Sequence, residues 1–245
     1  MREATERRKD GMGMRRKVVV LGMALLSVIP SFRRLSAQVG HDPGHSPYHD
    51  LPKGAAWVAT FGYLGGSRGS VGVGISDGAT GGIRYEVPFG AIGASLGIGY
   101  GKTDRFVVNP FVAPASRRTG PFDNNVVLID AALQLQLTGR KTWRGFAPYF
   151  GGALGVAVSG AAPKDTSGYK FGTKVTLAPN AGVRWYPARR FSVRADFRLL
   201  LWKLSYPLQY KAPDNNNDPT VLPAAASLTE WTAHPWATIG LGWIF

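Results

Sequence analysis

Apolar side chains recur at every second position over long segments of this chain, and residues 231–245 show the pattern most clearly. One face of this segment carries Trp231, Ala233, Pro235, Ala237, Ile239, Leu241, Trp243 and Phe245. Thr, Gly, His and Trp make up most of the other face. A period of two predicts a β-strand with one apolar side. The strand exceeds the usual length of about 5–6 residues and meets the roughly 9–11 residues that a tilted strand needs to cross a bilayer.

The same alternation predicts seven further strands. They cover residues 55–64, 79–87, 91–103, 127–138, 146–159, 175–185 and 191–201. Short links at 88–90, 139–145 and 187–190 alternate with longer ones at 65–78, 104–124, 160–170 and 206–230. Short turns at one end and long loops at the other are typical of outer-membrane barrels. The sequence therefore predicts an all-β fold, namely an eight-stranded antiparallel up-and-down transmembrane β-barrel preceded by a signal peptide.

The signal peptide is predicted from residues 14–37. Arg15, Arg16 and Lys17 precede an apolar run at 18–30. A basic start followed by an apolar core of about 7–15 residues is typical of secretory signals, and the run is shorter than the roughly 20 residues of a spanning helix. With cleavage expected after Ala37, the chain divides into an N-terminal extension and signal peptide (1–37), an irregular periplasmic segment (38–54) and the barrel (55–245). An uncleaved anchor is the alternative for the first part.

The polar face of the strands distinguishes a membrane barrel from a soluble one. It is rich in glycine, and its charged members are Arg84, Glu86, Asp130, Arg184, Arg194, Asp196 and Arg198. Small residues fit the narrow interior of an eight-stranded barrel, whereas a solvated outer face would carry many Lys and Glu. On the apolar face, Leu, Val and Ile lie at mid-strand and aromatic residues near both ends, as the two interfaces of a membrane require. A soluble ligand-binding barrel in the periplasm is the alternative.

Composition and charge narrow the function further. The chain of 245 residues has no cysteine, which excludes disulfides and thiolate metal sites. Its net charge is +14, but residues 1–37 hold nine Lys/Arg and three Asp/Glu, which leaves 29 − 9 = 20 basic and 15 − 3 = 12 acidic residues, or +8. No basic helix or RNA-binding motif accompanies this charge, so no nucleic-acid partner is predicted. Attraction to an anionic bacterial membrane is the simpler use.

The terminal aromatic residue Phe245 resembles the C-terminal signature of bacterial outer-membrane barrels, which their assembly machinery reads. With the alternation and the aromatic girdles, it makes residues 55–245 similar to the small outer-membrane barrel families typified by the OmpX and OmpA transmembrane domains. The resemblance implies an outer-membrane location and Phe245 as an assembly signal. An even number of strands returns both termini to the periplasmic side. The resemblance implies little about function, because these families include adhesion, defence and structural proteins.

The seven charged residues of the polar face map to the predicted lumen. Burying such charges singly is costly, so we expect the four Arg and the three carboxylates to pair. Bidentate pairs would plug the pore. We interpret the set as a structural interior network, and a gate or a narrow anion-biased pore is the alternative.

Histidines near the start of the barrel raise the question of a metal site. His41, His45 and His49 recur every four residues beside Asp42 and Asp50. Imidazole and carboxylate can bind zinc or copper. However, the prolines and glycine between the histidines oppose the helix that would align them. A solvated segment is favoured, and no metal site is predicted.

His234 lies on the lumen face and raises the alternative of a lipid A-modifying enzyme, an acyltransferase or deacylase. Such catalysis needs a Ser and an acidic residue within hydrogen-bond reach of the His. No Ser lies beside His234 in the sequence, although Ser205 or Ser227 could approach it. Residues 215–218 carry side-chain oxygens that could bind calcium, but they lack the ligand spacing of an EF-hand, so a solvated loop is favoured. We therefore predict no catalytic residue, no cofactor and no metal.

The resulting prediction is a monomeric, non-enzymatic outer-membrane β-barrel with a structural or surface-interaction role. Its expected partners are outer-membrane lipid, the barrel-assembly machinery and an extracellular ligand at the long loops. Loops 104–124 and 206–230 are the expected contact surfaces, because functional variation concentrates in loops.

Overall fold

The structure is a computed structural model, and it describes residues 46–160, 165, 167–212 and 218–245. The predicted signal peptide, His41 and His45 lie outside the described residues. So do residues 215–217 of the segment tested above for calcium binding.

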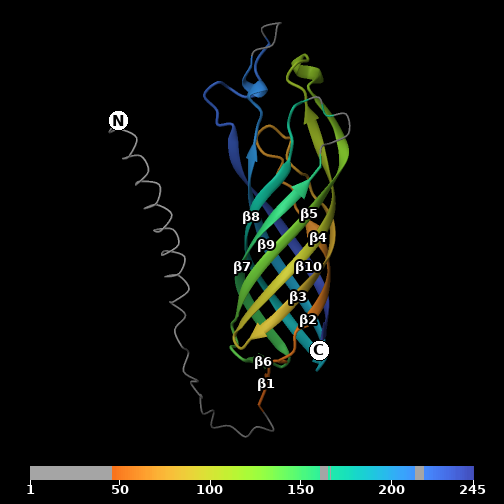
Figure 1. The fold of residues 1–245 in the computed structure, drawn as a ribbon, viewed down its shortest axis with the longest axis vertical. Coiled ribbons are helices and arrows are strands. Elements are labelled where there is room, and N and C mark those ends of the chain that lie inside the picture. Colours follow the sequence, from red (N-terminus) through yellow and green to blue (C-terminus); the bar gives the residue numbers. More distant parts are fainter. Residues whose placement is uncertain (1–45, 161–164, 166, 213–217) are drawn as a thin grey trace, which may run out of the picture. The chain divides into compact units, whose positions relative to one another are not determined.

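Eight antiparallel strands close into a ring, which Figure 1 shows as an upright cylinder whose strands are tilted. Their bounds are β2 (Ala56–Leu64), β3 (Gly78–Phe89), β4 (Ile92–Val108), β5 (Arg118–Gln136), β7 (Phe146–Ser159), β8 (Gly172–Ala188), β9 (Phe191–Ser205) and β10 (Thr229–Ile244). The last strand pairs with the first, from Trp236 opposite Leu64 to Ile244 opposite Ala56. Closure pairs the backbone groups of every strand, as a hydrocarbon environment demands. The predicted eight-stranded antiparallel barrel is confirmed.

Two short strands were not predicted. β1 (Tyr48–Asp50) pairs with β6 (Lys141–Trp143), at the end of the barrel that also holds the C-terminus (Figure 1). The expectation of irregular structure is therefore wrong for residues 48–50, and the expected short link 139–145 contains a strand. A two-residue turn at Arg144 and Gly145, with φ values of 50° and 84°, joins β6 to β7, as tight hairpins require. A strand of three residues is too short for an alternating pattern to predict it.

The second long loop is shorter than predicted. β4 and β5 stay paired as far as Val108 opposite Arg118, with a register shift between Arg105 and Val107. The expected loop 104–124 shrinks to 109–117. The outer part of this hairpin lies beyond the segments with alternating apolar residues. Neither face of that part has to be apolar, so the alternation did not predict it. Its loop contains the short 3-10 helix η2 (Pro114–Ser116), and loop 206–228 contains η3 (Leu208–Lys211). In the described part of the chain, no helix is long and apolar enough to cross a membrane.

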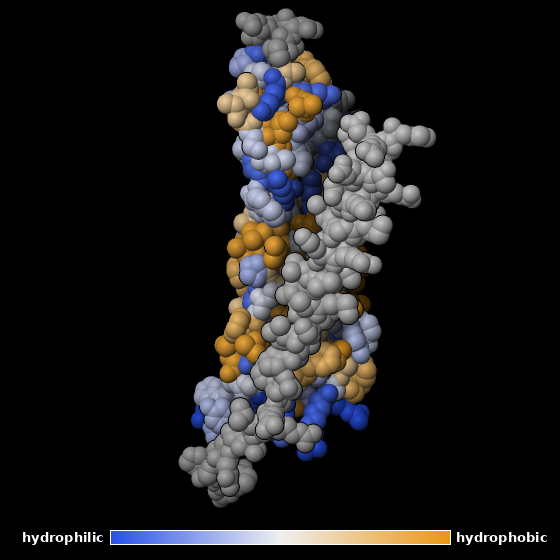
Figure 2. Space-filling model, turned by 60° about the vertical axis from the view of Figure 1, so that its left-hand side comes forward, coloured by the Kyte–Doolittle hydropathy of each residue, from blue (hydrophilic) through white to orange (hydrophobic). Residues whose placement is uncertain are grey.

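The barrel is apolar on the outside and polar on the inside. Leu96 and Leu133, at mid-strand, are 63% and 64% exposed, whereas Arg198 on the inner face is 2% exposed. Aromatic side chains lie toward the ends of the strands, and Trp57 and Tyr85 pack with ring centroids 4.9 Å apart. Figure 2 shows hydrophobic side chains over the middle of the cylinder and hydrophilic ones toward both ends of this face. This is the inverse of a soluble barrel.

Candidate functional site: an ion-pair network across the lumen

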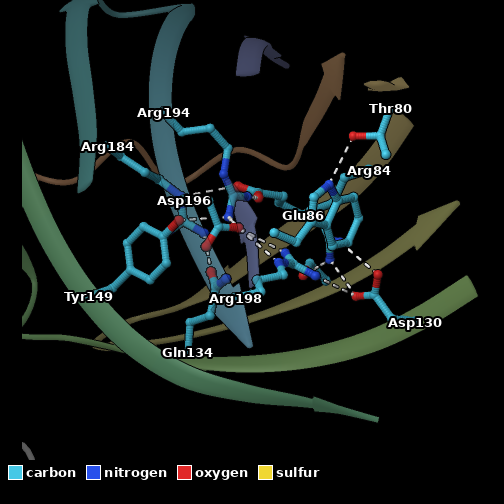
Figure 3. Close-up of polar contacts among 12 residues, drawn as sticks. Thr80, Arg84, Glu86, Asp130, Gln134, Tyr149, Arg184, Arg194, Asp196 and Arg198 are labelled. Carbon is cyan, nitrogen blue, oxygen red and sulfur yellow. Dashed lines mark hydrogen bonds and ion pairs between the residues drawn. The ribbon is translucent and has the colours of Figure 1, made fainter. Parts of the chain in front are cut away.

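The seven charged residues predicted for the lumen are all between 2% and 9% exposed, and they form one connected set of ion pairs (Figure 3). We call this set the lumen network. Arg84 and Glu86 come from β3, Asp130 from β5, Arg184 from β8, and Arg194, Asp196 and Arg198 from β9. With four guanidinium groups and three carboxylates, the network carries a net charge of 4 − 3 = +1.

At one end of the network, Arg84 binds Asp130 in a bidentate pair. Its two terminal nitrogens lie 2.8 Å from the two carboxylate oxygens, and one of them also donates to Ser95 at 3.0 Å. Gly97 on β4 stands between these residues, opposite Arg84 on one side and Asp130 on the other. A Cβ at Gly97 would lie 2.6 Å from Nη2 of Arg84. Because Gly97 has no Cβ, the guanidinium of Arg84 has room to cross β4 and reach Asp130.

Asp130 also binds Arg198, which carries the network across the lumen. Nη1 of Arg198 donates to Asp130 at 3.0 Å, while its Nε and Nη2 donate to Oδ2 of Asp196 at 3.0 and 2.9 Å. The same oxygen accepts from Nη2 of Arg194 at 2.6 Å. Alternate residues of β9 point to the same side of the sheet. Asp196 therefore lies between two arginines and compensates both.

Glu86 completes the network by holding two arginines that face each other. Arg184 and Arg194 are directly opposite on β8 and β9, and like charges in that position destabilise a sheet. Glu86 pairs with both, with its Oε2 3.1 Å from Nε of Arg184 and its Oε1 bound to Nη1 of Arg194. In a ring of eight strands β3 and β8 are four positions apart. The Glu86–Arg184 pair thus spans the lumen.

Three uncharged residues of the site were not singled out from the sequence. Tyr149 accepts a hydrogen bond from Arg194 at 2.6 Å, and the Arg184 guanidinium lies 4.6 Å from its ring centroid. Gln134 accepts from Arg184. Trp236 lies 5.3 Å from the Arg198 guanidinium, and its indole N–H donates to Thr80 at 2.9 Å. All three belong to the alternate residues of their strands that face the lumen, so the alternation could have identified them as lumen residues.

A small cavity lies on the short-turn side of the network. Its volume is about 40 Å³, and it is lined by Glu86, Arg184, Gln136, Tyr186 and Ser192 among others. A polar cavity of this size is large enough to hold ordered water.

Toward the long loops, the interior changes to an apolar and aromatic cluster. Its loop residues are Val73, Ile75, Tyr169, Phe171, Tyr206, Tyr210 and Leu222, and they pack on Leu64, Trp202 and Leu204 of the barrel wall. We call it the loop cluster. Arg105 and Asp165 form a buried ion pair beside it, with the Arg105 guanidinium 5.2 Å from the Tyr169 ring. Arg117 ties loop 109–117 to the backbone of Pro219. The loops therefore fold over the mouth of the barrel.

His234 is fully buried between the two regions. Its ring stacks on Trp202 with centroids 3.8 Å apart, Nδ1 accepts from the Ser67 N–H at 3.1 Å, and Nε2 lies 3.0 Å from the Thr232 hydroxyl. Its ring nitrogens thus contact a backbone amide and a threonine hydroxyl. Within the described residues, neither Ser205 nor Ser227, nor a carboxylate, is hydrogen-bonded to the ring. These contacts fix the position of the imidazole beside Trp202 of the loop cluster.

The other candidate residues lie at the short-turn end. His49 is exposed on β1, and its carbonyl accepts from Thr142 at 3.3 Å. Among the residues that the structure describes, no group of three or more His, Cys, Asp or Glu could hold a metal ion. Phe245 is 62% exposed, and its N–H donates to the carbonyl of Ala55 at 3.0 Å.

No protein-family model matches the chain, and no curated protein matches it. Solved structures do. OprG, an outer membrane protein from Pseudomonas aeruginosa, aligns with a TM-score of 0.50 and 14% identity, over 82% of this chain and 99% of that one. Neisserial surface protein A aligns with a TM-score of 0.46 and 12% identity, over 82% and 98%. Ail of Yersinia pestis, solved with the heparin analogue sucrose octasulfate, has a TM-score of 0.35 and 12% identity, over 78% and 99%.

The likeness to OprG, at low identity but over nearly all of its length, establishes the fold. The chain is a β-barrel of the small outer-membrane type. This agrees with the resemblance to the OmpX and OmpA barrels expected from the alternating strands.

Proposed function

We propose that this protein is a non-enzymatic barrel that spans the bacterial outer membrane, with a closed lumen and a structural or surface-interaction role carried by its long loops. In this proposal the short turns and both termini face the periplasm, the loops face outward, and Phe245 serves as the signal for the assembly machinery. The protein acts as a monomer.

The inverted placement of side chains is the observation that carries the proposal. Large apolar residues cover the outside, including Phe61, Leu96, Leu133, Leu154 and Ile239, each more than 60% exposed. Water would penalise such a surface by about 25 cal/mol for each Å² of apolar area, whereas lipid does not. The seven charged groups of the lumen network are buried instead. A bilayer is the solvent that suits both faces.

The closed lumen follows from the lumen network and the loop cluster together. Ion pairs cross the interior from β3 to β8 and from β5 to β9, and the aromatic loop cluster covers the mouth. A solute would have to break several buried charge pairs to pass. The narrow pore is therefore the less favoured alternative, and the loops supply the surface by which the protein would meet a partner.

Fractionation with gel migration, and protease treatment of intact cells, together test the membrane barrel. The mature chain should fractionate with outer membranes, need detergent for extraction, and migrate differently on a gel before and after boiling, as closed barrels do. Protease added to intact cells should cut at the long loops and leave the short turns untouched. A chain that stays dissolved and monodisperse without detergent would refute the proposal.

A planar-bilayer recording tests the closed lumen separately. We expect no large stable conductance from the folded barrel. The matched variant Asp130→Ala/Glu86→Ala, which removes two of the three carboxylates, should raise the frequency of openings if the network closes the lumen. A large, steady conductance from the unmodified barrel would favour the pore instead.

A further inference from the structure

Exposed basic residues gather at the short-turn end of the barrel. They are Lys53, Arg140, Lys141, Arg144, Arg189 and Arg190. Asp50 and the terminal carboxylate of Phe245 are the negative groups exposed with them, so this end of the described chain has a surplus of 6 − 2 = four positive charges. Within the described residues none of the six takes part in an ion pair. We call this set the basic rim.

The fold brings the basic rim together from three separate segments, namely Lys53, residues 140–144 and residues 189–190. The pairing of β1 with β6 holds Lys53 near Lys141, and the Leu51 N–H donates to the Arg140 carbonyl at 3.0 Å. The Ile244 N–H donates to the Arg190 carbonyl at 2.9 Å, which ties the β8–β9 turn to the end of β10. Backbone bonds therefore position the rim. Arg144 also lies over the Trp143 ring at 5.3 Å, and no described ion pair neutralises any of the six side chains.

A groove of about 1230 Å³ runs between these segments. Its lining includes three basic residues, Lys53, Arg189 and Arg190, one carboxylate, Asp50, and two aromatic residues, Trp243 and Phe245. Both aromatic side chains are more than half exposed on the outer face of the barrel. The groove therefore joins a cluster of cations directly to the apolar belt.

We propose that the basic rim binds an anionic phospholipid of the inner leaflet, with its phosphate between Arg189, Arg190 and Lys53 and its acyl chains along Trp243 and Phe245. The inference rests on the proposed function, because it needs the barrel to lie in a bilayer. Arginine is suited to phosphate, since its planar guanidinium donates two parallel hydrogen bonds. Clusters of Lys and Arg beside a membrane segment attract anionic lipid.

The neighbouring aromatic belt favours a lipid over a soluble polyanion as the occupant. Trp and Tyr at the ends of membrane strands lie at the level of the headgroups. Trp143 and Trp185 follow and precede the groove residues Thr142 and Tyr186 in the chain, and they are 47% and 42% exposed. The phosphates of the adjacent lipids therefore lie at the height of the rim. A cell-wall polymer would match the charge but would leave the two aromatic residues of the groove uncovered.

Native mass spectrometry of the membrane-extracted protein tests the site. The protein, in a nonionic detergent, is offered phosphatidylglycerol and phosphatidylcholine with identical acyl chains. We expect phosphatidylglycerol adducts to exceed phosphatidylcholine adducts, and Arg189→Glu/Arg190→Glu to reduce that ratio by roughly fivefold for each residue, the equivalent of about 1 kcal/mol per basic group. The control Lys102→Glu/Lys203→Glu makes the same change of charge at exposed positions of the opposite end and should leave the ratio unchanged.

The outcomes separate the two proposals. Gel migration before and after boiling first shows that each variant is a closed barrel; a wild-type chain that needs no detergent would refute the membrane barrel itself. A folded barrel that binds both lipids equally, or loses its preference as much in the control as in the rim variant, would overturn only the lipid site. Displacement of phosphatidylglycerol by soluble cell-wall fragments would also overturn it, in favour of a cell-wall partner.

Discussion

Replacing Asp130 by Ala should destabilise the barrel more than any other single change in the lumen network. Asp130 holds Arg84 through two hydrogen bonds of 2.8 Å and Arg198 through one of 3.0 Å. Arg198 would keep Asp196, but Arg84 would keep only the Ser95 hydroxyl. The net charge of the network would rise from +1 to +2 in the interior of the barrel.

The expected magnitude follows from the unpaired guanidinium. Removing one partner of a buried ion pair costs about 3–5 kcal/mol. At about 1.4 kcal/mol per tenfold, this is a factor of roughly 10² to 4 × 10³ in the ratio of folded to unfolded protein. Arg84→Ala should cost less, because Asp130 keeps Arg198 and the network becomes neutral. The double variant Arg84→Ala/Asp130→Ala restores the charge of +1 and should recover part of the loss, since both partners of the pair are gone.

The assay is reversible urea unfolding of the barrel in lipid vesicles, followed by the gel shift between folded and unfolded forms. The four proteins make a double-mutant cycle that isolates the energy of the pair. Asp123→Ala, at an exposed carboxylate of the same strand, is the control and should change stability by less than about 0.5 kcal/mol. The reasoning fails if Arg84→Ala is as destabilising as Asp130→Ala, or if the double variant is no more stable than Asp130→Ala.

Three further predictions concern other parts of the barrel. Gly97→Ala should lower stability by about 1–3 kcal/mol, because its Cβ would meet Arg84, whereas Gly152→Ala, with nothing within 4 Å, should not; urea unfolding compares them. Burial raises the pKa of Tyr210 to about 12 from 10.0, so its ionisation is favoured in the unfolded loop and loop stability should fall as pH rises from 10 to 12; limited proteolysis should show faster loop cleavage over that range, less so for Tyr210→Phe. His234→Ala should leave lipid A unchanged by mass spectrometry, and any altered acylation would revive the enzyme alternative.

Alternation was enough to predict the strands because every strand of a membrane barrel meets the same physical requirement. Each crossing must offer lipid an apolar face and the lumen a small or polar one, so residues 91–103 and 231–245 reveal their structure without reference to other strands. Where the chain leaves the bilayer, the requirement lapses. The upper part of the β4–β5 hairpin and the short strands β1 and β6 were missed for that reason.

The pairing inside the lumen lay beyond the sequence pattern. Alternation puts Arg84, Asp130 and Arg198 on the inner face, but any of four arginines could have met any of three carboxylates. Their partners depend on the stagger between strands far apart in the chain and on glycines such as Gly97 that leave room for a guanidinium. The loop cluster was hidden for a related reason, because its aromatic residues follow no period.

The order of side chains along the chain determined that this protein is a barrel with an apolar outside, since one residue in two must face the lipid whatever its neighbours are. Only the closed tertiary structure decided which charges meet, how loops cover the mouth and how three segments assemble the basic rim. Those features join residues as far apart as Lys53 and Arg190, and contacts of that kind depend on ring closure and register rather than on local sequence.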